Sequence, residues 1–261
     1  MQTTPSNPND LTGQVAVVTG ASRGIGAAIA GALSASGARV VLASRKLEGM
    51  EAVAEEIRQR GGDALAVACH TGRAQDCENL AARAQEAYGG IDILVNNAAT
   101  SPHFGPILEA EESQWDKTFE VNVKGYVHTI RSCAPRMRER GGGRIVNIAS
   151  VAGMFPHRGL GVYCVSKAAV LMLTRSLGME LAKENIRVNA IAPGIIRTKF
   201  SEVLWSSPAA GEKALATIPQ GRIGDPEDIV GAVLYFAGQA SGFTTGSVLV
   251  IDGGQTLGLA Y

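Results

Sequence analysis

The sequence predicts an α/β protein built as one doubly wound domain, in which a parallel sheet of about seven strands is covered by helices on both faces. Two observations predict this fold class. Short runs rich in Val, Ile and Leu alternate with longer segments of helical spacing from Gln14 to about Ile251. The short runs show little alternation of polar and apolar residues, which is typical of strands buried on both faces. A repeated strand–helix–strand order then favours parallel pairing through right-handed crossovers.

The expected strands are apolar runs of five or six residues, at Val15–Thr19, Arg39–Ser44, Ala64–Cys69, Ile91–Asn96, Arg144–Ile148, Ile186–Ile191 and Ser247–Ile251. The expected helices lie at Lys46–Arg60, Arg73–Tyr88, Glu112–Arg138 and Tyr163–Lys183, and a small-residue helix follows the first strand. A further helix is expected to begin near Pro226, because a proline followed by acidic residues suits a first helical turn.

Composition limits the kinds of partner. The 24 basic and 24 acidic residues balance, which argues against nucleic acid or an anionic membrane surface as the main partner. The longest segment without a formal charge, between Asp228 and Asp252, contains polar residues and glycines and is not expected to span a membrane. The four cysteines and four histidines are scattered, so we expect free thiols, no metal site and a cytoplasmic protein.

Two segments stand apart from the repeating pattern. Residues 1–10 are polar and contain no apolar run of the kind found in signal peptides, so we expect a flexible tail before a single domain at residues 11–261. Residues 198–219 interrupt the alternation of strands and helices and carry apolar side chains. An apolar insertion at the carboxyl end of a strand predicts a lid over a substrate.

A glycine-rich turn joins the first strand to the first helix. Glycines in such a turn let the backbone approach a pyrophosphate, and the helix that follows presents free N–H groups and the positive end of its dipole. The turn therefore predicts dinucleotide binding. Its expected contact residues are Gly20, Ser22, Arg23, Gly24, Ile25 and Gly26.

The residues after the second strand predict NADP(H) rather than NAD(H). An NAD site usually places an acidic residue there to bind the ribose 2′-hydroxyl. This chain has Arg45 and Lys46 instead, and Arg23 lies in the neighbouring turn. A guanidinium binds phosphate through two hydrogen bonds, so Arg45 suits a 2′-phosphate. The alternative is that Arg45 and Lys46 are solvated charges.

Six elements occur in order at spacings that resemble those of the short-chain dehydrogenases/reductases: the Thr-Gly-x3-Gly-x-Gly turn, Asn96-Asn97-Ala98-Ala99, Asn122, Ser150, Tyr163-x3-Lys167 and Pro193-Gly194. The resemblance covers nearly the whole chain. Within the family, several stretches are similar to the NADPH-dependent carbonyl/retinol reductase group. The resemblance implies a Rossmann-type domain, a nicotinamide cofactor and a homotetramer.

The resemblance also implies the roles of four residues. Tyr163 is expected to act as general acid and base, Ser150 to hydrogen-bond the reacting oxygen, and Lys167 to tune Tyr163 and bind ribose. Four residues apart on a helix, Tyr163 and Lys167 share one face. A nearby ammonium would lower the phenol pKa from its usual value of about 10. Asn122 is expected to hold a water in a proton relay, or else to stabilise a kink in its helix.

Further cofactor contacts follow from the resemblance: Asn96 and Ala98 beside the adenosine ribose, and Ile196 and Thr198 at the carboxamide and phosphates. The chain departs from the family where an Asp commonly ends the third strand, because it has His70 and Thr71 there. We expect His70 and Thr71 to contact the adenine end. Losing that acidic residue makes the site more positive, in line with NADP.

Apolar side chains near the strand ends predict an apolar or aromatic substrate, and we expect Phe104, Phe155 and Trp205 to contact it together with Ser150 and Tyr163. The leading interpretation is an NADP-dependent ketone/aldehyde reductase or alcohol dehydrogenase. A 3-oxoacyl thioester reductase and a steroid-type dehydrogenase remain alternatives on the same scaffold. A dinucleotide sensor without catalysis is a further alternative, which has no need for all four catalytic residues.

Overall fold

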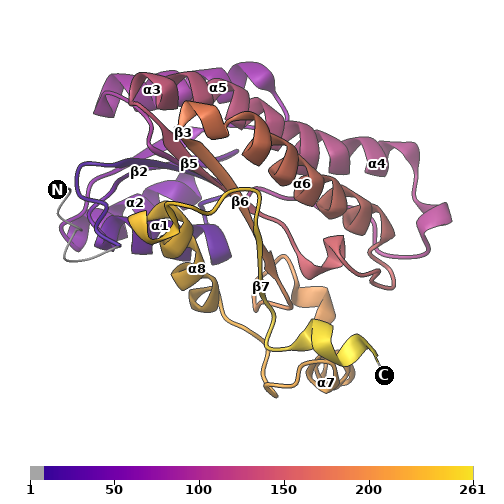
Figure 1. The fold of residues 1–261 in the computed structure, drawn as a ribbon. Helices are drawn as coiled ribbons and strands as arrows, with labels where there is room; N and C mark the ends of the chain where they lie inside the picture. Colours follow the sequence, from indigo (N-terminus) through magenta and orange to yellow (C-terminus); the bar gives the residue numbers. More distant parts are fainter. Residues whose placement is uncertain (1–8, 261) are drawn as a thin grey trace.

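A sheet of parallel strands runs through the protein (Figure 1). The computed structural model describes residues 9–260, and the side chains of residues 9–258. In this part of the chain the sheet has seven strands, in the spatial order β3 (Ala64–Ala68), β2 (Arg39–Ser44), β1 (Val15–Thr19), β4 (Ile93–Asn96), β5 (Gly143–Ile148), β6 (Ile186–Pro193) and β7 (Val248–Ile251). Every neighbouring pair is parallel, which confirms the predicted doubly wound fold.

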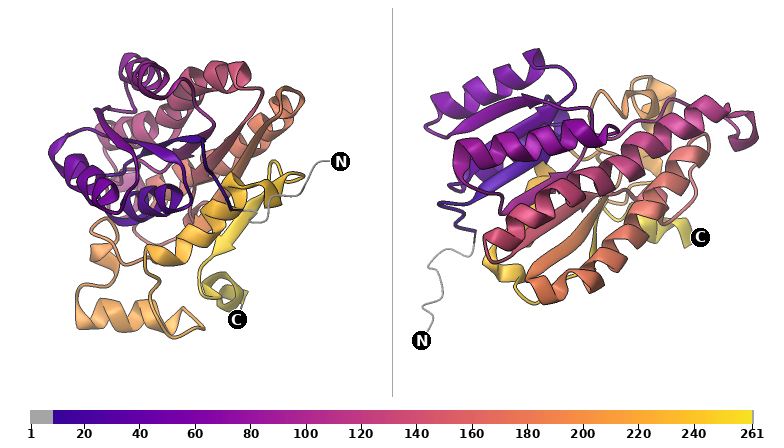
Figure 2. Two further views of the ribbon diagram at one scale, coloured as in Figure 1. Left: turned by 90° about the vertical axis from the view of Figure 1, so that its left-hand side faces the viewer. Right: turned by 90° about the horizontal axis from the view of Figure 1, so that it is seen from above.

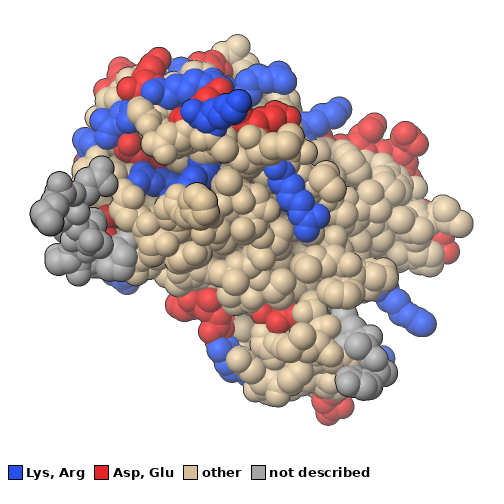
Figure 3. All heavy atoms as spheres, viewed as in Figure 1, with Lys and Arg blue, Asp and Glu red and all other residues tan. Residues whose placement is uncertain are grey.

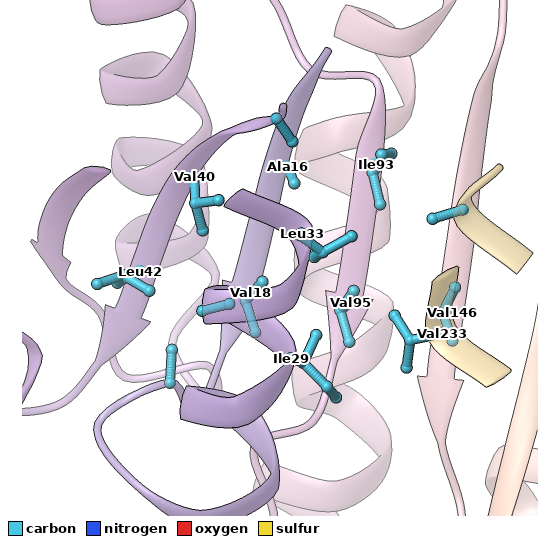
Figure 4. Close-up of a cluster of buried hydrophobic side chains, with 14 of the residues drawn as sticks. Ala16, Val18, Ile29, Leu33, Val40, Leu42, Ile93, Val95, Val146 and Val233 are labelled. Carbon is cyan, nitrogen blue, oxygen red and sulfur yellow. The ribbon is translucent and has the colours of Figure 1, made fainter. Parts of the chain in front are cut away.

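One face of the sheet is covered by α1 (Gly24–Ala35), α2 (Glu48–Gln59) and α8 (Glu227–Ala237). Figure 4 shows Ile29 and Leu33 of α1 lying against valines and isoleucines of β1, β2 and β4, with Val233 of α8 beside Val146 of β5. All of these side chains are fully or almost fully buried. Burial of so many aliphatic groups, at about 25 cal/mol per Å² of apolar area, fixes α1 on the sheet and so fixes the glycine turn before it.

The opposite face is covered by α3 (Ala74–Tyr88), α5 (Gly125–Glu139) and α6 (Gly161–Glu180), with α4 (Glu112–Phe119) extending from the same layer (Figures 1 and 2). Buried residues such as Leu80 and Met137 fill the space against the strands. Cys69, Cys77 and Cys133 belong to this core, and all four cysteines are free thiols. Small apolar thiols fit this packing as ordinary core residues.

The expected elements recur with small shifts at their ends, and one expected helix is divided. Glu112–Arg138 forms α4, a π-helical turn at Glu120–Lys124, and α5. The turn contains Asn122, whose side chain bonds outside its own helix. Shorter 3-10 turns lie at Ile107–Glu109, Val151–Gly153, Ala182–Glu184, Glu202–Leu204, Gln239–Ser241 and Gln255–Ala260.

The insertion after β6 contains a 3-10 turn and helix α7 (Pro208–Ala216). Ser207 caps α7, because its hydroxyl accepts a hydrogen bond from the Ala210 amide at 3.2 Å. Ala214, Ile218 and Ile223 form a small buried cluster against which Trp205 packs. The segment therefore has a hydrophobic core of its own beside the carboxyl end of the sheet.

The expected tail, residues 1–10, lies outside the described residues except for Asn9 and Asp10. No helix between residues 9 and 260 is long and apolar enough to cross a bilayer. β1 lies in the middle of the sheet, between β2 and β4. The chain first adds β2 and β3 on one side of β1 and then adds β4 to β7 on the other side, so the winding of the sheet reverses at β1. Ligands of open α/β sheets bind at such a reversal, outside the carboxyl ends of the strands.

Candidate active site

A cavity of about 630 Å³ opens at the carboxyl ends of β1, β4, β5 and β6. It extends from the glycine turn to helix α6 and to the first part of the insertion. The expected contact residues in its wall are Gly20, Ser22, Arg23, Gly24, Ile25, Arg45, Ala98, Phe104, Ser150, Tyr163, Lys167, Ile196 and Thr198. These residues come from distant parts of the sequence, and the strand order brings them together.

The glycine turn leaves backbone donors at the cavity wall. Gly20 and Gly24 have φ values of 65° and 56°, a conformation that other residues rarely adopt. No side chain caps the start of α1, where Arg23, Gly24 and Ile25 line the cavity. Free N–H groups and the positive end of the helix dipole suit a pyrophosphate. Gly26 does not line the cavity; a β-carbon there would lie 2.3 Å from the Gly20 carbonyl oxygen, so it permits the tight turn.

Arg23 of the glycine turn, Arg45 after β2 and Lys117 are among the basic residues that line the cavity, together with Lys167, Arg197 and Lys199. Arg23 and Arg45 were expected there, whereas Lys117, on α4, was not assigned a role from the sequence. Lys46 lies outside the wall and is exposed. Arg45, directly after β2, is placed to bind an anionic group such as a 2′-phosphate.

His70 does not line the cavity in this structure, contrary to expectation. Its Nε2 lies 3.1 Å from Lys117 Nζ, and its Nδ1 accepts a hydrogen bond from the Gly72 amide at 3.1 Å. Lys117 also donates to Glu120 at 3.0 Å. Thr71 is buried, and its carbonyl faces His128. His70 thus orients Lys117, and its own contact with the cavity is indirect.

Ser150 and Tyr163 come together at the cavity wall. Ser150 follows β5 and Tyr163 lies in the first turn of α6, and both line the cavity. Burial raises the pKa of the Tyr163 phenol above its usual value, while the nearby Ser150 hydroxyl acts in the opposite direction. The net direction is opposite to the lowering expected from the sequence, because desolvation is the largest influence. At neutral pH the phenol holds its proton and can donate it.

Lys167 is buried one helical turn beyond Tyr163. Its Nζ donates to the Ile148 carbonyl at 2.7 Å and lies 5.6 Å from the centre of the Tyr163 ring. Desolvation lowers its pKa to about 7. An amine that titrates near neutrality next to a phenol is suited to proton transfer.

The side chain of Asn122 does not line the cavity. Its amide donates to the Thr100 carbonyl at 2.9 Å and to Ser166 Oγ at 3.0 Å, and its oxygen accepts from the Thr100 backbone amide at 2.8 Å. The side chain therefore ties the π-helical turn to the loop after β4 and to α6. These contacts of the side chain agree with the alternative in which Asn122 stabilises an irregular helix.

Asn96, for which a ribose contact was expected, does not line the cavity. It is fully buried, donates to Asn147 at 3.0 Å and accepts from Thr129 at 2.6 Å. Its neighbour Asn97 lines the cavity and donates to the Thr19 and Gly20 carbonyls. The sequence contains a signal that distinguishes Asn96 from Asn97. Asn96 is the last residue of β4 and is buried between neighbouring strands, whereas Asn97 follows the strand and can reach the cavity.

Several large apolar side chains also line the cavity. Phe104, Leu160, Phe200 and Val203 line it, and the Phe200 ring lies 5.7 Å from that of Tyr163. Two expected residues are absent from the wall. Phe155 is partly exposed to solvent, and Trp205 packs in the α7 cluster with its indole donating to Ser201 Oγ at 3.0 Å.

Within the described side chains, no group of three His, Cys, Asp or Glu residues could hold a metal ion. A parallel α/β sheet with a glycine turn and a Ser–Tyr–Lys group at one edge defines the class of dinucleotide-dependent oxidoreductases.

Comparison with known proteins agrees with that class. A family model described as "Enoyl-(Acyl carrier protein) reductase" matches residues 20–256. The chain is 44% identical, over 95% of its length and 88% of the relative's, to "Dehydrogenase/reductase SDR family member 4" of Bos taurus. The protein therefore belongs to the short-chain dehydrogenase/reductase family and is an oxidoreductase; nicotinamide dinucleotides are the cofactors of that family.

Solved structures show the same architecture. A putative NAD(P)-dependent gluconate 5-dehydrogenase of Beutenbergia cavernae, with bound NADP, has a TM-score of 0.91, 36% identity, and coverage of 96% of this chain and all of that one. A 7α-hydroxysteroid dehydrogenase complexed with NADH has a TM-score of 0.92 and 34% identity, covering 97% of this chain and 98% of that one. The two neighbours differ in both cofactor and substrate.

Proposed function

We propose that the protein is an NADP(H)-dependent carbonyl reductase that also oxidises the corresponding alcohols. The observation that carries this proposal is the convergence of Ser150, Tyr163 and Lys167 in the wall of one cavity. A dinucleotide sensor would not require these three groups to converge. The family membership supports the reaction type, and the apolar side chains around Phe104 and Phe200 favour an apolar or aromatic substrate.

In reduction, Tyr163 donates its proton to the carbonyl oxygen as negative charge develops there. Ser150 hydrogen-bonds the same oxygen and so holds it beside the phenol. The buried ammonium of Lys167 stabilises the phenolate that remains. A bound nicotinamide would supply the hydride. In oxidation, the Tyr163 phenolate would accept the proton of the alcohol.

NADP(H) is the cofactor that the basic wall favours. Arg45 and Arg23 line the cavity beyond the glycine turn, and no acidic side chain lines that wall within the described residues. A 2′-phosphate would bind a guanidinium through charge-assisted hydrogen bonds. The NADP-bound gluconate 5-dehydrogenase supports this choice, whereas the NADH-bound steroid dehydrogenase keeps NAD(H) as the alternative.

A steroid-type substrate is the second candidate. It is supported by the 7α-hydroxysteroid dehydrogenase, with 34% identity and a TM-score of 0.92. The 3-oxoacyl thioester alternative is supported by the description of the matching family model, which names a reductase of substrates carried on acyl carrier protein. A planar aromatic ketone, a steroid ketone and an acyl thioester differ in shape, so rates on the three classes would separate these candidates.

We also propose a cytoplasmic homotetramer. Helix α6 carries exposed Val165, Met172 and Met179, which are seven residues apart and share one face. Figure 3 shows few charged side chains across the middle of the face that Figure 1 presents. Phe243 and Leu249, near and in β7, are also exposed. Apolar faces of this kind suit contacts between copies of the chain, and the mass in solution would test the proposal.

The experiment follows NADPH oxidation over a panel of aromatic aldehydes, diketones, steroid ketones and 3-oxoacyl thioesters. Tyr163→Phe should lose more than about a thousandfold in kcat/KM, since it removes the proton donor but keeps the ring. Tyr88→Phe is the matched control, because the Tyr88 hydroxyl bonds Asp63 on the surface. Turnover of Tyr163→Phe within about tenfold of the unmodified enzyme would contradict the proposal, since tenfold is only about 1.4 kcal/mol in the barrier.

A further inference from the structure

A buried phenol outside the Ser–Tyr–Lys group lies against Lys167. Tyr126, in the first turn of α5, donates its hydroxyl proton to the Ile148 carbonyl at 2.9 Å. Lys167 Nζ donates to the same carbonyl at 2.7 Å and to Tyr126 Oη at 3.4 Å. The three atoms form a closed triangle that joins α5, β5 and α6 directly beneath the cavity.

The triangle is shielded from water. Tyr126 and Lys167 are each 1% exposed. Tyr126 packs in an apolar cluster with Ala149, Val170 and Leu171, and Lys167 Nζ lies 5.3 Å above its ring. The titratable groups facing the ammonium are the phenols of Tyr126 on α5 and Tyr163 on α6, while β5 contributes a carbonyl and the turn Val151–Gly153 has no titratable side chain.

The direction of the hydrogen bonds fixes what Tyr126 can do. Its one proton is committed to Ile148, so its oxygen offers only lone pairs to Lys167. The Ile148 carbonyl likewise can only accept. Two acceptors side by side favour the ammonium over the neutral amine and engage two of its three N–H groups. The third N–H is left for the cavity, where Lys167 forms part of the wall.

We propose that Tyr126 is a positioning residue that keeps Lys167 protonated and directs its remaining N–H toward the cavity. The proposal rests on the proposed function, since it concerns the amine that serves Tyr163. It adds to the Ser–Tyr–Lys group a hydroxyl that touches neither substrate nor cofactor. The backbone oxygen through which it acts is two residues before Ser150, so the same contact also anchors the end of β5.

The test is Tyr126→Phe, followed by kcat/KM for carbonyl reduction from pH 5.5 to 9.5. Loss of one acceptor should lower the pKa of Lys167, so the amine deprotonates at lower pH. The alkaline limb of the profile should therefore move down by about one pH unit. At pH 8.5 the variant should be about tenfold slower than the unmodified enzyme, and at pH 5.5 the two rates should agree within about 1.5-fold. The affinity for NADPH should weaken over the same alkaline range.

Tyr88→Phe is again the control, since it removes a surface hydroxyl from a tyrosine and should leave the profile in place. A Tyr126→Phe enzyme with a lower Tm but an unmoved profile would overturn the inference and leave a packing role only. Should the variant fail to fold, lysine labelled with ¹⁵N in the unmodified protein gives the answer: one exchange-protected ammonium signal, missing in Lys167→Met, is expected. Its absence would equally overturn the inference.

The two proposals fail separately. If Tyr163→Phe is inactive while Tyr126→Phe keeps the profile of the unmodified enzyme, the acid–base function stands and the positioning role falls. If Tyr163→Phe retains turnover, the proposed function itself is wrong, whatever Tyr126 does.

Discussion

The side-chain amide of Asn97 donates hydrogen bonds to the Thr19 carbonyl at 3.0 Å and to the Gly20 carbonyl at 3.2 Å. This contact joins the end of β4 to the glycine turn after β1, across the point where the winding of the sheet reverses. The shape of the turn therefore depends on a residue more than 70 positions away in the sequence. The cofactor end of the site is thus a tertiary structure, built from two strand ends.

Gly26→Ala should destabilise the protein. The added β-carbon would lie 2.3 Å from the Gly20 oxygen and 2.6 Å from Asn97 Nδ2. Relief requires movement of backbone, at about 3 kcal/mol or more, which lowers Tm by about 6–10 °C for a domain of this size. Gly31→Ala, in the same helix but with open space around it, should raise Tm by about 2 °C. Calorimetry of both variants checks this; equal Tm values would contradict the close packing of the turn.

Ser150→Ala should lower kcat/KM about a hundredfold while leaving Tm nearly unchanged. The substitution removes a hydroxyl that lowers the pKa of Tyr163 and would hydrogen-bond the reacting oxygen. It also removes an acceptor for the Ala152 amide, at 3.1 Å, which accounts for a small loss of stability. Ser113→Ala, on the exposed side of α4, is the control and should be silent. Steady-state rates with NADPH measure the effect, and a loss below about threefold would remove Ser150 from the reaction.

Arg45→Asp should reverse the cofactor preference. A carboxylate in this wall would repel a 2′-phosphate and accept hydrogen bonds from a 2′-hydroxyl. The affinity for NADPH should fall about 10- to 100-fold, as expected for lost charge-assisted hydrogen bonds, and that for NADH should rise. Arg60→Asp, at the end of α2 and outside the cavity, should change neither. Titration by intrinsic fluorescence gives both constants; equal affinities of the unmodified protein for the two cofactors would refute the assignment.

The effect of Lys167 on the free energy of unfolding should depend on pH. Burial lowers its pKa from 10.5 to about 7, so between these values the unfolded chain binds a proton that the folded chain lacks. The free energy of unfolding should therefore rise with pH in this window, relative to Lys167→Met, by about 5 kcal/mol in total. Below pH 7 the difference should be constant. Urea unfolding at a series of pH values provides the comparison, and a flat difference between pH 7 and 10 would rule out a depressed pKa.

The sequence predicted the fold and the position of the site because both follow from local patterns. Buried strands read as apolar runs, and the glycine turn, Ser150 and Tyr163 each lie where a strand ends or a helix begins. Family membership and the seven-stranded parallel sheet are confirmed by the comparisons and the structure. The roles of the individual site residues stay predictions for the experiments above.

Features that depend on packing between elements could not be predicted. The pKa of Tyr163 rises because of burial, which a sequence does not reveal. Trp205 turns into the α7 cluster because Ala214, Ile218 and Ile223 offer it an apolar surface nearer than the cavity. The π-helical turn around Asn122 likewise follows from bonds to Thr100 and Ser166, which are distant in sequence. In each case, contacts with residues distant in the sequence determine the position or the pKa of the side chain.

The strand order also has a consequence for synthesis of the protein. β1 is made first but lies in the middle of the sheet, and one of its two edges is covered only when β4 emerges from the ribosome. The cavity is closed later still, by residues up to Leu204. A nascent chain that stops before that point carries the glycine turn without the rest of the cavity wall, so the complete site can form only after Leu204 has been made.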